Sequence, residues 1–293
     1  MKVKRLNPEC INCLLDRHLN YFANECDEDV RINYMQNVLK IISNAKYFES
    51  APELVEKLVT LQKEFFGTTT DYSETKSYFN KLMLGIEDEL ETKIYQSDFP
   101  LKTALKLALA GNYIDFGAMK NVDEAVLNDT LSTAISAEIN ETEFENLKNE
   151  LKSSKSLVYI TDNCGEIVLD KLFIKTIKAY NPNINVNVIV RGEAVLNDCT
   201  IEDAVEVQMH KIADVLSNGT AIAGTCLNRI SVDAKDLIDR AEIIISKGQG
   251  NFESLRYSNK NIYYLFLCKC NLFVKKFNVK HLTGIFTNDL RMK

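Results

Sequence analysis

The chain has 293 residues, 46% hydrophobic and 26% charged, which is enough for a substantial core in one or two domains. Its 35 basic and 41 acidic residues give a net charge of −6 without a basic stripe, which excludes a nucleic-acid backbone as the main partner. No apolar run approaches the roughly 20 residues of a membrane helix. The N-terminus MKVKRLNPEC lacks the apolar region of a secretory signal.

Eight cysteines and only three histidines restrict the kinds of metal site the chain can form. Without a secretory signal, the cysteines predict a reduced protein in the cytoplasm and not a disulfide framework. His18, His210 and His281 lie far apart in the sequence, which argues against a zinc site built on imidazoles. A metal would therefore use oxygen ligands or thiolates. No oligomeric state is predicted.

Residues 1–150 are predicted to form an all-helical N-terminal or cap domain. The segments RINYMQNVLKIISNA, APELVEKLVTLQKEFF and LKTALKLALAGN place apolar residues at spacings of three and four, as amphipathic helices do.

Residues 151–293 are predicted to form an α/β domain, because apolar strands alternate there with helices. The predicted strands are SLVYI (156–160), INVNVIV (184–190), EIIIS (242–246) and, as the last strand, NIYYLFLC (261–268). The predicted helices are GEIVLDKLFIKTIKAY, TIEDAVE and SVDAKDLIDRA. This alternation predicts a mostly parallel, Rossmann-like sheet sandwiched by helices.

Polar clusters follow three of these strands. Asp162–Glu166 follows the first strand, Arg191 and Asp198 follow the second, and Lys247–Asn251 follows the third. Because the carboxyl ends of parallel strands meet at one edge of a sheet, the three clusters are expected to form one site.

The residue types in this site predict chemistry on a phosphate group. Asp162, Asn163 and Asp198 supply hard oxygen ligands that suit Mg²⁺ or Mn²⁺. Lys247, read here as part of a flexible loop with glycines, suits a point-charge contact to phosphate. A metal and a lysine on either side of one anion are what phosphoryl transfer requires.

Simpler interpretations of each cluster stay open. An isolated Asp-Asn or KGQGN is typical of a helix cap or a turn, Glu166 suits a helix N-terminus, and Arg191 suits an ion pair between loops. A nucleotide-cofactor site would show G-x-G-x-x-G, and a haloacid-dehalogenase-type phosphatase would show Asp-x-Asp; the first turn shows neither. The convergence of three clusters favours a site.

The same residues resemble a known family. The series at Asp162–Glu166, Arg191–Ala204 and Lys247–Glu253 resembles the damage-control phosphatases, formerly called domain of unknown function 89. AGNYIDFG at Ala110–Gly117 resembles another family signature, and PECINC at Pro8–Cys13 is similar to the start of the prokaryotic branch. The resemblance implies an α/β sandwich with an N-terminal helical domain, and metal-dependent hydrolysis of phosphate monoesters on sugars or damaged metabolites.

Carried over by position, the resemblance also implies residue roles. Metal ligands are Asp162, Asn163 and Asp198, for Mn, Mg, Co or Ni, and Lys247 binds the phosphate. Contacts to the substrate or to these ligands come from Glu166, Arg191 and Asn251, and from Asn112 and Asp115 of the helical domain. Metal-activated water is favoured as the nucleophile over an aspartyl-phosphate on Asp162 or Asp198, because an aspartate that binds the metal is not free to attack the phosphate.

The cysteine pairs and two other functions complete the alternatives. Cys10 and Cys13 form C-x-x-C, and Cys268 and Cys270 form C-x-C; together they predict either a structural thiol cluster or buried free thiols. A carboxyl methyltransferase, proposed within the same family, and a non-catalytic phosphometabolite-binding protein are the alternatives to a phosphatase.

Overall fold

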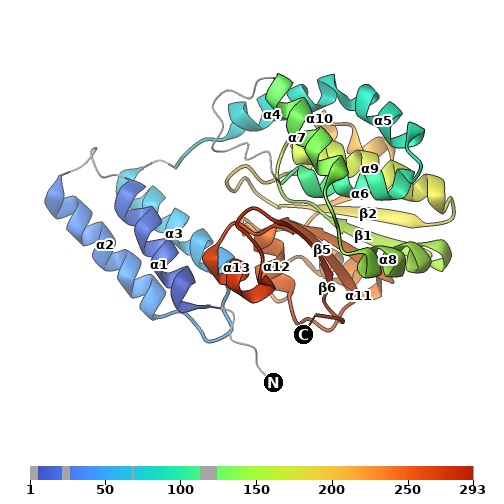
Figure 1. Cartoon of the computed structure of the whole chain (residues 1–293). Coiled ribbons are helices and arrows are strands. Elements are labelled where there is room, and N and C mark those ends of the chain that lie inside the picture. Colours follow the sequence, from blue (N-terminus) through green and yellow to red (C-terminus); the bar gives the residue numbers. More distant parts are fainter. Residues whose placement is uncertain (1–5, 22–26, 68, 113–123, 293) are drawn as a thin grey trace.

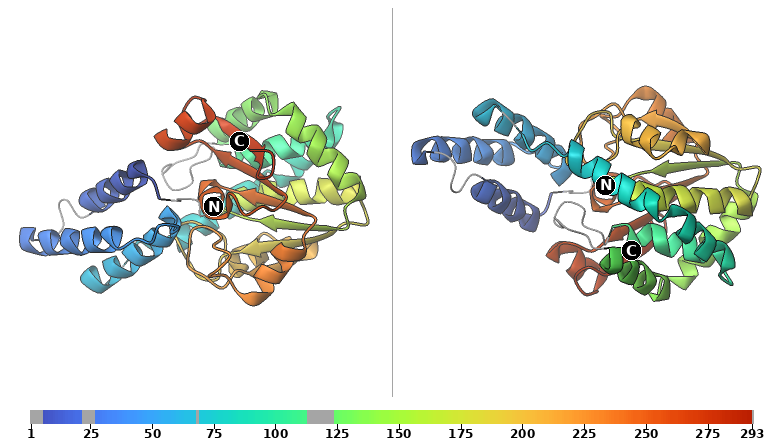
Figure 2. Two further views of the ribbon diagram at one scale, coloured as in Figure 1. Left: turned by 90° about the horizontal axis from the view of Figure 1, so that it is seen from below. Right: turned by 90° about the horizontal axis from the view of Figure 1, so that it is seen from above.

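The computed structural model describes residues 6–21, 27–67, 69–112 and 124–292. Its first three helices are α1 (Pro8–Tyr21), α2 (Glu28–Ser43) and α3 (Ala51–Phe66). They enclose a small core of their own around Tyr34, Val38 and Leu58 and project to one side of the sheet (Figures 1 and 2). Ser50 and Glu53 form a capping box that fixes the start of α3.

The next five helices belong to the main body of the protein. They are α4 (Ser73–Gly85), α5 (Glu87–Gln96), α6 (Pro100–Ala110), α7 (Glu124–Ser136) and α8 (Glu141–Ser153). Their apolar faces share one buried cluster with the sheet, so they form a layer over the sheet and not a separate core. The proposed boundary at residue 150 marks a change of pattern along the chain, whereas the buried cores divide between α3 and α4.

A six-stranded sheet follows, with the strand order β3-β2-β1-β4-β5-β6. Its strands are β1 (Ser156–Ile160), β2 (Asn185–Val190), β3 (Asp214–Ser217), β4 (Ile243–Lys247), β5 (Ile262–Leu267) and β6 (Gly284–Asn288). All neighbours pair in parallel except β5 and β6. The predicted fold, a mostly parallel sheet between helices, is confirmed.

Helices cover both faces of this sheet. The remaining helices are α9 (Glu166–Tyr180), α10 (Ile201–Glu206), the 3₁₀ turn η1 (Met209–Lys211), α11 (Val232–Arg240), α12 (Gln249–Leu255) and α13 (Asn271–Phe277). Along β1, Leu157 and Tyr159 face α9 and the helices before it, while Val158 and Ile160 face α11, α12 and α13. This burial on both faces explains the nearly continuous apolar runs of the central strands.

The structure corrects three details of the sequence interpretation. NIYYLFLC contains β5 but is not the last strand, because β6 follows it. The short edge strand β3 was not predicted; its first residue is exposed, the other three are only partly buried, and the strand carries little apolar alternation. KGQGN is not a flexible loop: Lys247 ends β4, and α12 begins at Gln249. In the described ranges, no helix is long and apolar enough to cross a membrane.

Candidate active site

The predicted site lies where the carboxyl ends of β1, β2 and β4 meet. Here the strand order reverses between β1 and β4, the usual position of ligand sites in such sheets. Asn163 and Asp198 form an isolated antiparallel bridge. Backbone hydrogen bonds flank it, from the Cys199 N–H to the Asp162 carbonyl at 2.8 Å and from the Cys164 N–H to the Asn197 carbonyl at 2.9 Å. The segments after β1 and β2 are therefore held together as one unit.

Asp162 and Asp198 are the two carboxylates of this unit, and both are largely buried, with 14% and 4% of their side chains exposed. Burial, followed by the charges of Asp198 and Glu166, raises the pKa of Asp162 to about 8. Arg191 and Lys269 oppose this rise. Burial also raises the pKa of Asp198, against the pull of Arg191. Burial and the neighbouring acids therefore disfavour the charged form of Asp162, and a cation bound beside it would favour that form.

Arg191 is the buried cation next to these two carboxylates. Its side chain is 1% exposed, and Nε donates to Asp198 Oδ2 at 2.6 Å. Nη1 donates to Asn251 Oδ1 and to the Gly224 carbonyl, each at 3.0 Å. Nη2 lies 3.6 Å from Asp162 Oδ1 and is a buried donor without a hydrogen-bond partner among the described residues. The Nη2 group is thus left to donate to an oxygen that the described residues do not supply.

Asn251 connects three strand ends through buried hydrogen bonds. It is fully buried, and its amide donates to the Lys247 carbonyl at 2.7 Å and to the Thr161 carbonyl at 3.0 Å. Together with its bond from Arg191, these contacts tie the ends of β1, β2 and β4 to one another. The predicted substrate contact of Asn251 stays a prediction.

Glu166 links the helical layer to the site. The Asn112 amide lies 2.6 and 2.7 Å from the two Glu166 carboxylate oxygens and 3.5 Å from Asp162 Oδ2. The Asn163 amide lies 2.9 Å from Asp162 Oδ2 and 3.3 Å from Glu166 Oε2. Gly111 packs so closely on Glu166 that a Cβ there would lie 2.6 Å from Cγ. The predicted residue Asp115 lies outside the described residues.

Lys247 points away from solvent into a cluster of acids. Its side chain is fully buried, and Nζ donates to the Ala108 carbonyl at 2.7 Å, to Asp170 at 2.6 Å and to Glu166. Burial lowers the pKa of Lys247, but Asp170 and Glu166 outweigh it, so the pKa lies above its ordinary value. The ammonium is therefore charged and uses its three N–H groups inside the protein. A phosphate contact, which stays a prediction, requires the exchange of one of these bonds.

The sequence reasoning missed several polar neighbours of the site. Asp170 accepts a hydrogen bond from the buried Tyr159 hydroxyl at 2.7 Å, and burial raises its pKa to about 7. Its position four residues after Glu166 on a buried helix face is a pattern that could have shown it. Asn80 accepts a bond from the Gly165 N–H at 2.7 Å, and no local sequence pattern indicates that contact between α4 and the turn after β1.

The arrangement fits a hard divalent cation. Two buried carboxylates, of which Asp198 raises the pKa of Asp162, gain from a shared positive charge, and the adjacent Asn163 adds a neutral amide oxygen. Asp162, Asn163 and Asp198 are the residues that would hold the ion. The described residues contain no group of three or more His, Cys, Asp or Glu side chains placed to hold a metal, so the fit depends on two carboxylates and an amide, completed by water or substrate oxygens.

The predicted thiol cluster is partly brought together. Cys10 and Cys13 each lie within electrostatic reach of Cys270, and burial followed by Glu253 and Cys270 raises the pKa of Cys10 to about 11. All four thiols of the predicted cluster are free. A structural role for the cluster stays a prediction.

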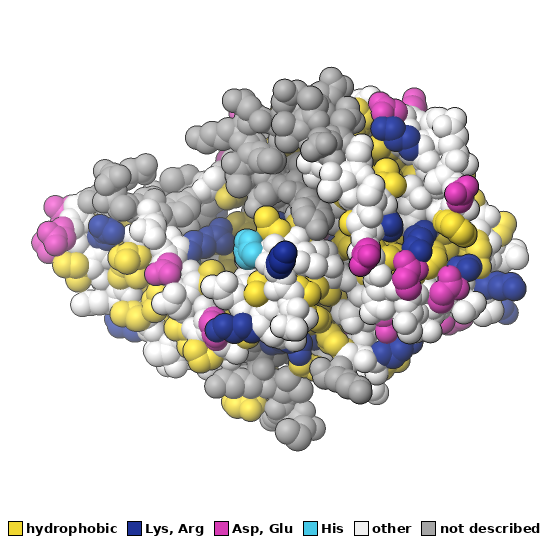
Figure 3. All heavy atoms as spheres, in the orientation of Figure 1, with side chains coloured by type: hydrophobic (Ala, Val, Ile, Leu, Met, Phe, Trp, Pro, Cys, Tyr) yellow, Lys and Arg dark blue, Asp and Glu magenta, His cyan; other side chains and the backbone are white. Residues whose placement is uncertain are grey.

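Two surface cavities are lined by residues that the structure describes. One of about 270 Å³ is bordered by Tyr72, Lys76 and the segment 194–196, and one of about 640 Å³ by α3 and Arg229. Neither is lined by Asp162 or Asp198, so the strand ends define the candidate site. On the face shown in Figure 3, acidic and basic side chains are interspersed and form no continuous basic patch.

Comparison with known proteins identifies the family of the chain. Residues 6–283 match the family model of the damage-control phosphatase ARMT1-like domain. The chain belongs to this family. It is 31% identical over 274 residues to a damage-control phosphatase of Archaeoglobus fulgidus, a match that spans 91% of this chain and 93% of the relative. It is 28% identical over 282 residues to a damage-control phosphatase of Pyrococcus horikoshii, spanning 92% and 93%. The names of these relatives support a phosphatase role in the family.

A further relative and the solved structure of the Pyrococcus horikoshii relative extend the comparison. A protein of Methanocaldococcus jannaschii is 32% identical over 280 residues, spanning 91% of this chain and 90% of the relative. The crystal structure of a Pyrococcus horikoshii protein of the same family, described as DUF89, superposes with a TM-score of 0.83 at 24% identity, covering 97% and 99% of the two chains. The damage-control phosphatase fold is therefore present over nearly the whole chain.

Proposed function

We propose that the protein is a divalent-metal-dependent phosphatase that hydrolyses phosphate monoesters of sugars or damaged metabolites. The observation that carries the proposal is the pairing of Asp162 and Asp198, both buried, with an unsatisfied N–H of Arg191 beside them. Carboxylates alone repel a phosphate, whereas carboxylates with a shared cation and a spare guanidinium donor attract one. Mn²⁺, Mg²⁺, Co²⁺ and Ni²⁺ are the candidate ions.

The residues of the candidate site have separate proposed roles in binding the cation and the substrate. Asp162, Asn163 and Asp198 would hold the cation, which when bound supplies charge neutralisation and lowers the pKa of a coordinated water. Arg191 orients Asp198 through Nε and offers Nη2 to an oxygen of the substrate. Asn163 is itself oriented by Asp162 and Glu166. The precise alignment of these groups contributes to rate because phosphoryl transfer depends mainly on positioning and charge.

The remaining predicted residues support this site. Glu166 is held by Asn112 and Lys247, so α6 and β4 fix the carboxylate that contacts Asn163. The substrate is proposed to be a small phosphorylated metabolite, and the protein is proposed to act in the cytoplasm.

The test is a phosphatase assay on metal-stripped protein with each of the four ions added back singly. The proposal predicts hydrolysis of 4-nitrophenyl phosphate or a sugar phosphate only with metal, and a loss of at least about 100-fold in Asp162→Asn and Asp198→Asn. Asp236→Asn, on the exposed side of α11, is the matched control and should keep full activity. Equal activity without metal, or full activity in both site variants, would refute the proposal. Metal-independent methyl transfer to carboxylates would favour the methyltransferase alternative.

A further inference from the structure

The turn that carries Asn163 is held in shape by a side chain from the helical layer. Gly165 follows Asn163 by two residues, is buried, and has φ of +77° at the start of α9. The first N–H groups of a helix point away from its own carbonyls and need an acceptor from elsewhere. For the Gly165 N–H, that acceptor is Asn80 Oδ1 of α4, at 2.7 Å. The shape of this turn therefore depends on α4.

Asn80 is in turn fixed by Glu206. The Asn80 side chain is fully buried, and its Nδ2 donates to Glu206 Oε2 at 2.7 Å. The Ser77 hydroxyl, also on α4, donates to the other Glu206 oxygen at 2.7 Å. Because the Gly165 N–H can only donate and the Glu206 carboxylate can only accept, the two partners allow a single orientation of the Asn80 amide. Its oxygen is thus directed at the turn.

The same face of α4 reaches the segment that carries Asp198. Lys76, four residues before Asn80, forms a largely buried ion pair with Asp203 at 2.6 Å. Asp203 Oδ2 accepts the N–H and the hydroxyl of Thr200, each at 2.8 Å, in the capping box that starts α10. Thr200 follows Asp198 by two residues, so α4 contacts the continuation of both segments that hold the proposed metal ligands.

The polar character of this face points to positioning more than to stability. The buried side chains of α4 are Lys76, Phe79, Asn80 and Met83. Apolar side chains at the two polar positions would need no partners, and a satisfied buried hydrogen bond contributes little net stability. What the Asn80 amide supplies is direction, because it fixes where the Gly165 N–H points.

We propose that Asn80 is a positioning residue of the metal centre, which acts through the Gly165 backbone to orient the Asn163 amide. The inference rests on the proposed phosphatase function and names a further residue for it. Asn80 touches neither the cation nor the substrate. Residues that orient metal ligands from outside affect affinity and rate because the cation tolerates little misplacement of its ligands.

The experiment compares the wild type with Asn80→Leu and with the double variant Asn80→Asp, Glu206→Gln. Leucine has a similar size but offers no acceptor to the Gly165 N–H. In the double variant the carboxylate moves to position 80, where it accepts from Gly165 and from the new amide at position 206, whose oxygen accepts from Ser77. All three proteins have the same net charge, so a difference in Mn²⁺ affinity between them does not come from added or lost charge.

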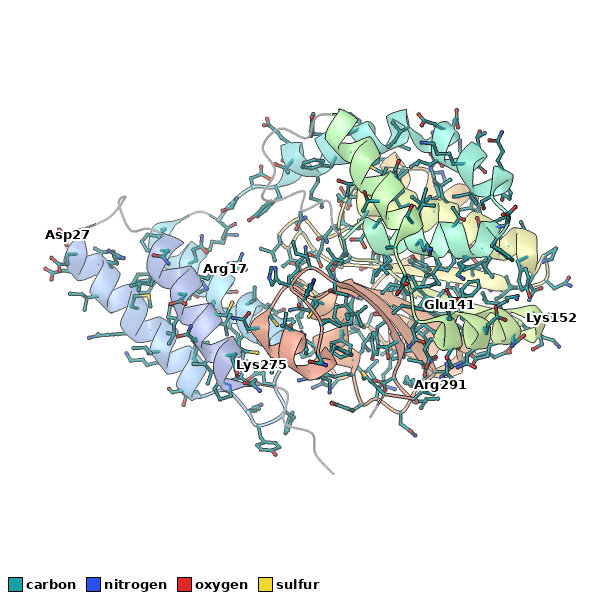
Figure 4. The ribbon with its side chains drawn as sticks, viewed as in Figure 1. Arg17, Asp27, Glu141, Lys152, Lys275 and Arg291 are labelled. Atoms are coloured by element: carbon teal, nitrogen blue, oxygen red, sulfur yellow. The ribbon has the colours of Figure 1, made fainter. Side chains whose placement is uncertain are left out.

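Asn181→Leu is the matched control for stability. Asn181 is a buried amide at the other end of α9, and it donates to the Leu151 and Ser154 carbonyls, each at 2.8 Å. It precedes β2, at the sheet edge opposite to the candidate site. Lys152, which follows Leu151 on α8, lies at the right-hand end of the molecule in Figure 4, away from α4 (Figure 1).

For each protein, electron paramagnetic resonance of free Mn²⁺ gives the Mn²⁺ dissociation constant, and thermal unfolding of the metal-free protein gives Tm. The values of kcat and KM are measured with 4-nitrophenyl phosphate at saturating Mn²⁺. Asn80→Leu should raise the Mn²⁺ dissociation constant about 10- to 100-fold and lower kcat, with a smaller change in KM because Asn80 does not touch the substrate. The double variant should stay close to the wild type. Asn181→Leu should lower Tm and leave Mn²⁺ binding and kcat unchanged.

The outcomes separate this inference from the function on which it rests. A wild type without metal-dependent hydrolysis would refute the phosphatase proposal itself. A metal-dependent wild type with unchanged Mn²⁺ affinity and kcat in Asn80→Leu would refute the role of Asn80 alone. So would a double variant as impaired as Asn80→Leu, or an equal loss of Mn²⁺ affinity in Asn181→Leu. If Asn80→Leu does not fold, Asn80→Ala takes its place in the same comparison.

Discussion

Replacing Lys247 by Met should destabilise the protein strongly, because it leaves a cluster of buried acids without its cation. Nζ contacts Glu166 and Asp170, and all three side chains are fully buried. Removing one partner of a buried ion pair costs about 3–5 kcal/mol. Two carboxylates and the Ala108 carbonyl lose their donor here, so the upper half of that range is expected. At roughly 2 °C per kcal/mol for a large domain, Tm should fall by about 8–10 °C.

The same variant gives a pH dependence with a definite sign. Without the ammonium, the folded-state pKa of Asp170 lies further above its unfolded value, so the folded protein binds more protons. The destabilisation is therefore largest above about pH 7 and shrinks as the pH falls toward about 5. Thermal unfolding of metal-stripped protein at several pH values measures it.

A second substitution tests the cause. Asp170→Asn in the Lys247→Met background removes one uncompensated carboxylate and should recover at least about 1 kcal/mol, whereas Asp170→Asn alone removes a partner of Lys247 and should destabilise. A Tm of Lys247→Met within about 2 °C of the wild type, or no recovery in the double variant, would contradict this account of Lys247.

Two further predictions concern other positions. Gly248→Ala should abolish activity and destabilise the fold by about 1–3 kcal/mol, because Gly248 has φ of +80° and touches the Asp162 carboxylate. Gly85→Ala is the control and should leave activity and stability unchanged, because nothing lies within 4 Å of a Cβ at Gly85. Measuring the activity and the Tm of both variants tests this prediction. Burial, with a smaller effect of nearby positive charge, lowers the pKa of His18 to about 4, so its neutral form, 2.6 Å from the Tyr34 hydroxyl, stabilises α1 at neutral pH. That stability should be lost as the pH falls from about 6.5 to 4, and His18→Gln should flatten this part of the Tm–pH curve; an unchanged slope would contradict it.

Much of the sheet could be predicted because its central strands are buried on both faces. SLVYI and EIIIS read as strands without ambiguity, and their order of appearance with intervening helices required parallel pairing. The edge strand β3 was not predicted, because Asp214 is exposed and the next three residues are only partly buried, so the strand carries little hydrophobic pattern. The antiparallel strand β6 was not predicted, because it follows a short helix at the end of the alternation of strands and helices.

The candidate site was predicted in part for a similar reason. The strand-end rule located Asp162, Asp198 and Arg191 together, since backbone topology alone fixes that edge. The sequence could not predict the direction in which the Lys247 side chain points. A side chain at a strand end can point to solvent or into the helical layer, and the packing of α6 and α9 decides between the two.

The most direct test of a metal centre at the strand ends is a crystal structure of the protein soaked with Mn²⁺ and orthophosphate, with anomalous diffraction to locate the metal. The account predicts one strong anomalous peak bound by Asp162, Asn163 and Asp198, with a phosphate oxygen within hydrogen-bond reach of Arg191 Nη2. A strong peak only elsewhere, such as at Cys10 and Cys13, or no peak at these three residues under saturating Mn²⁺, would contradict it.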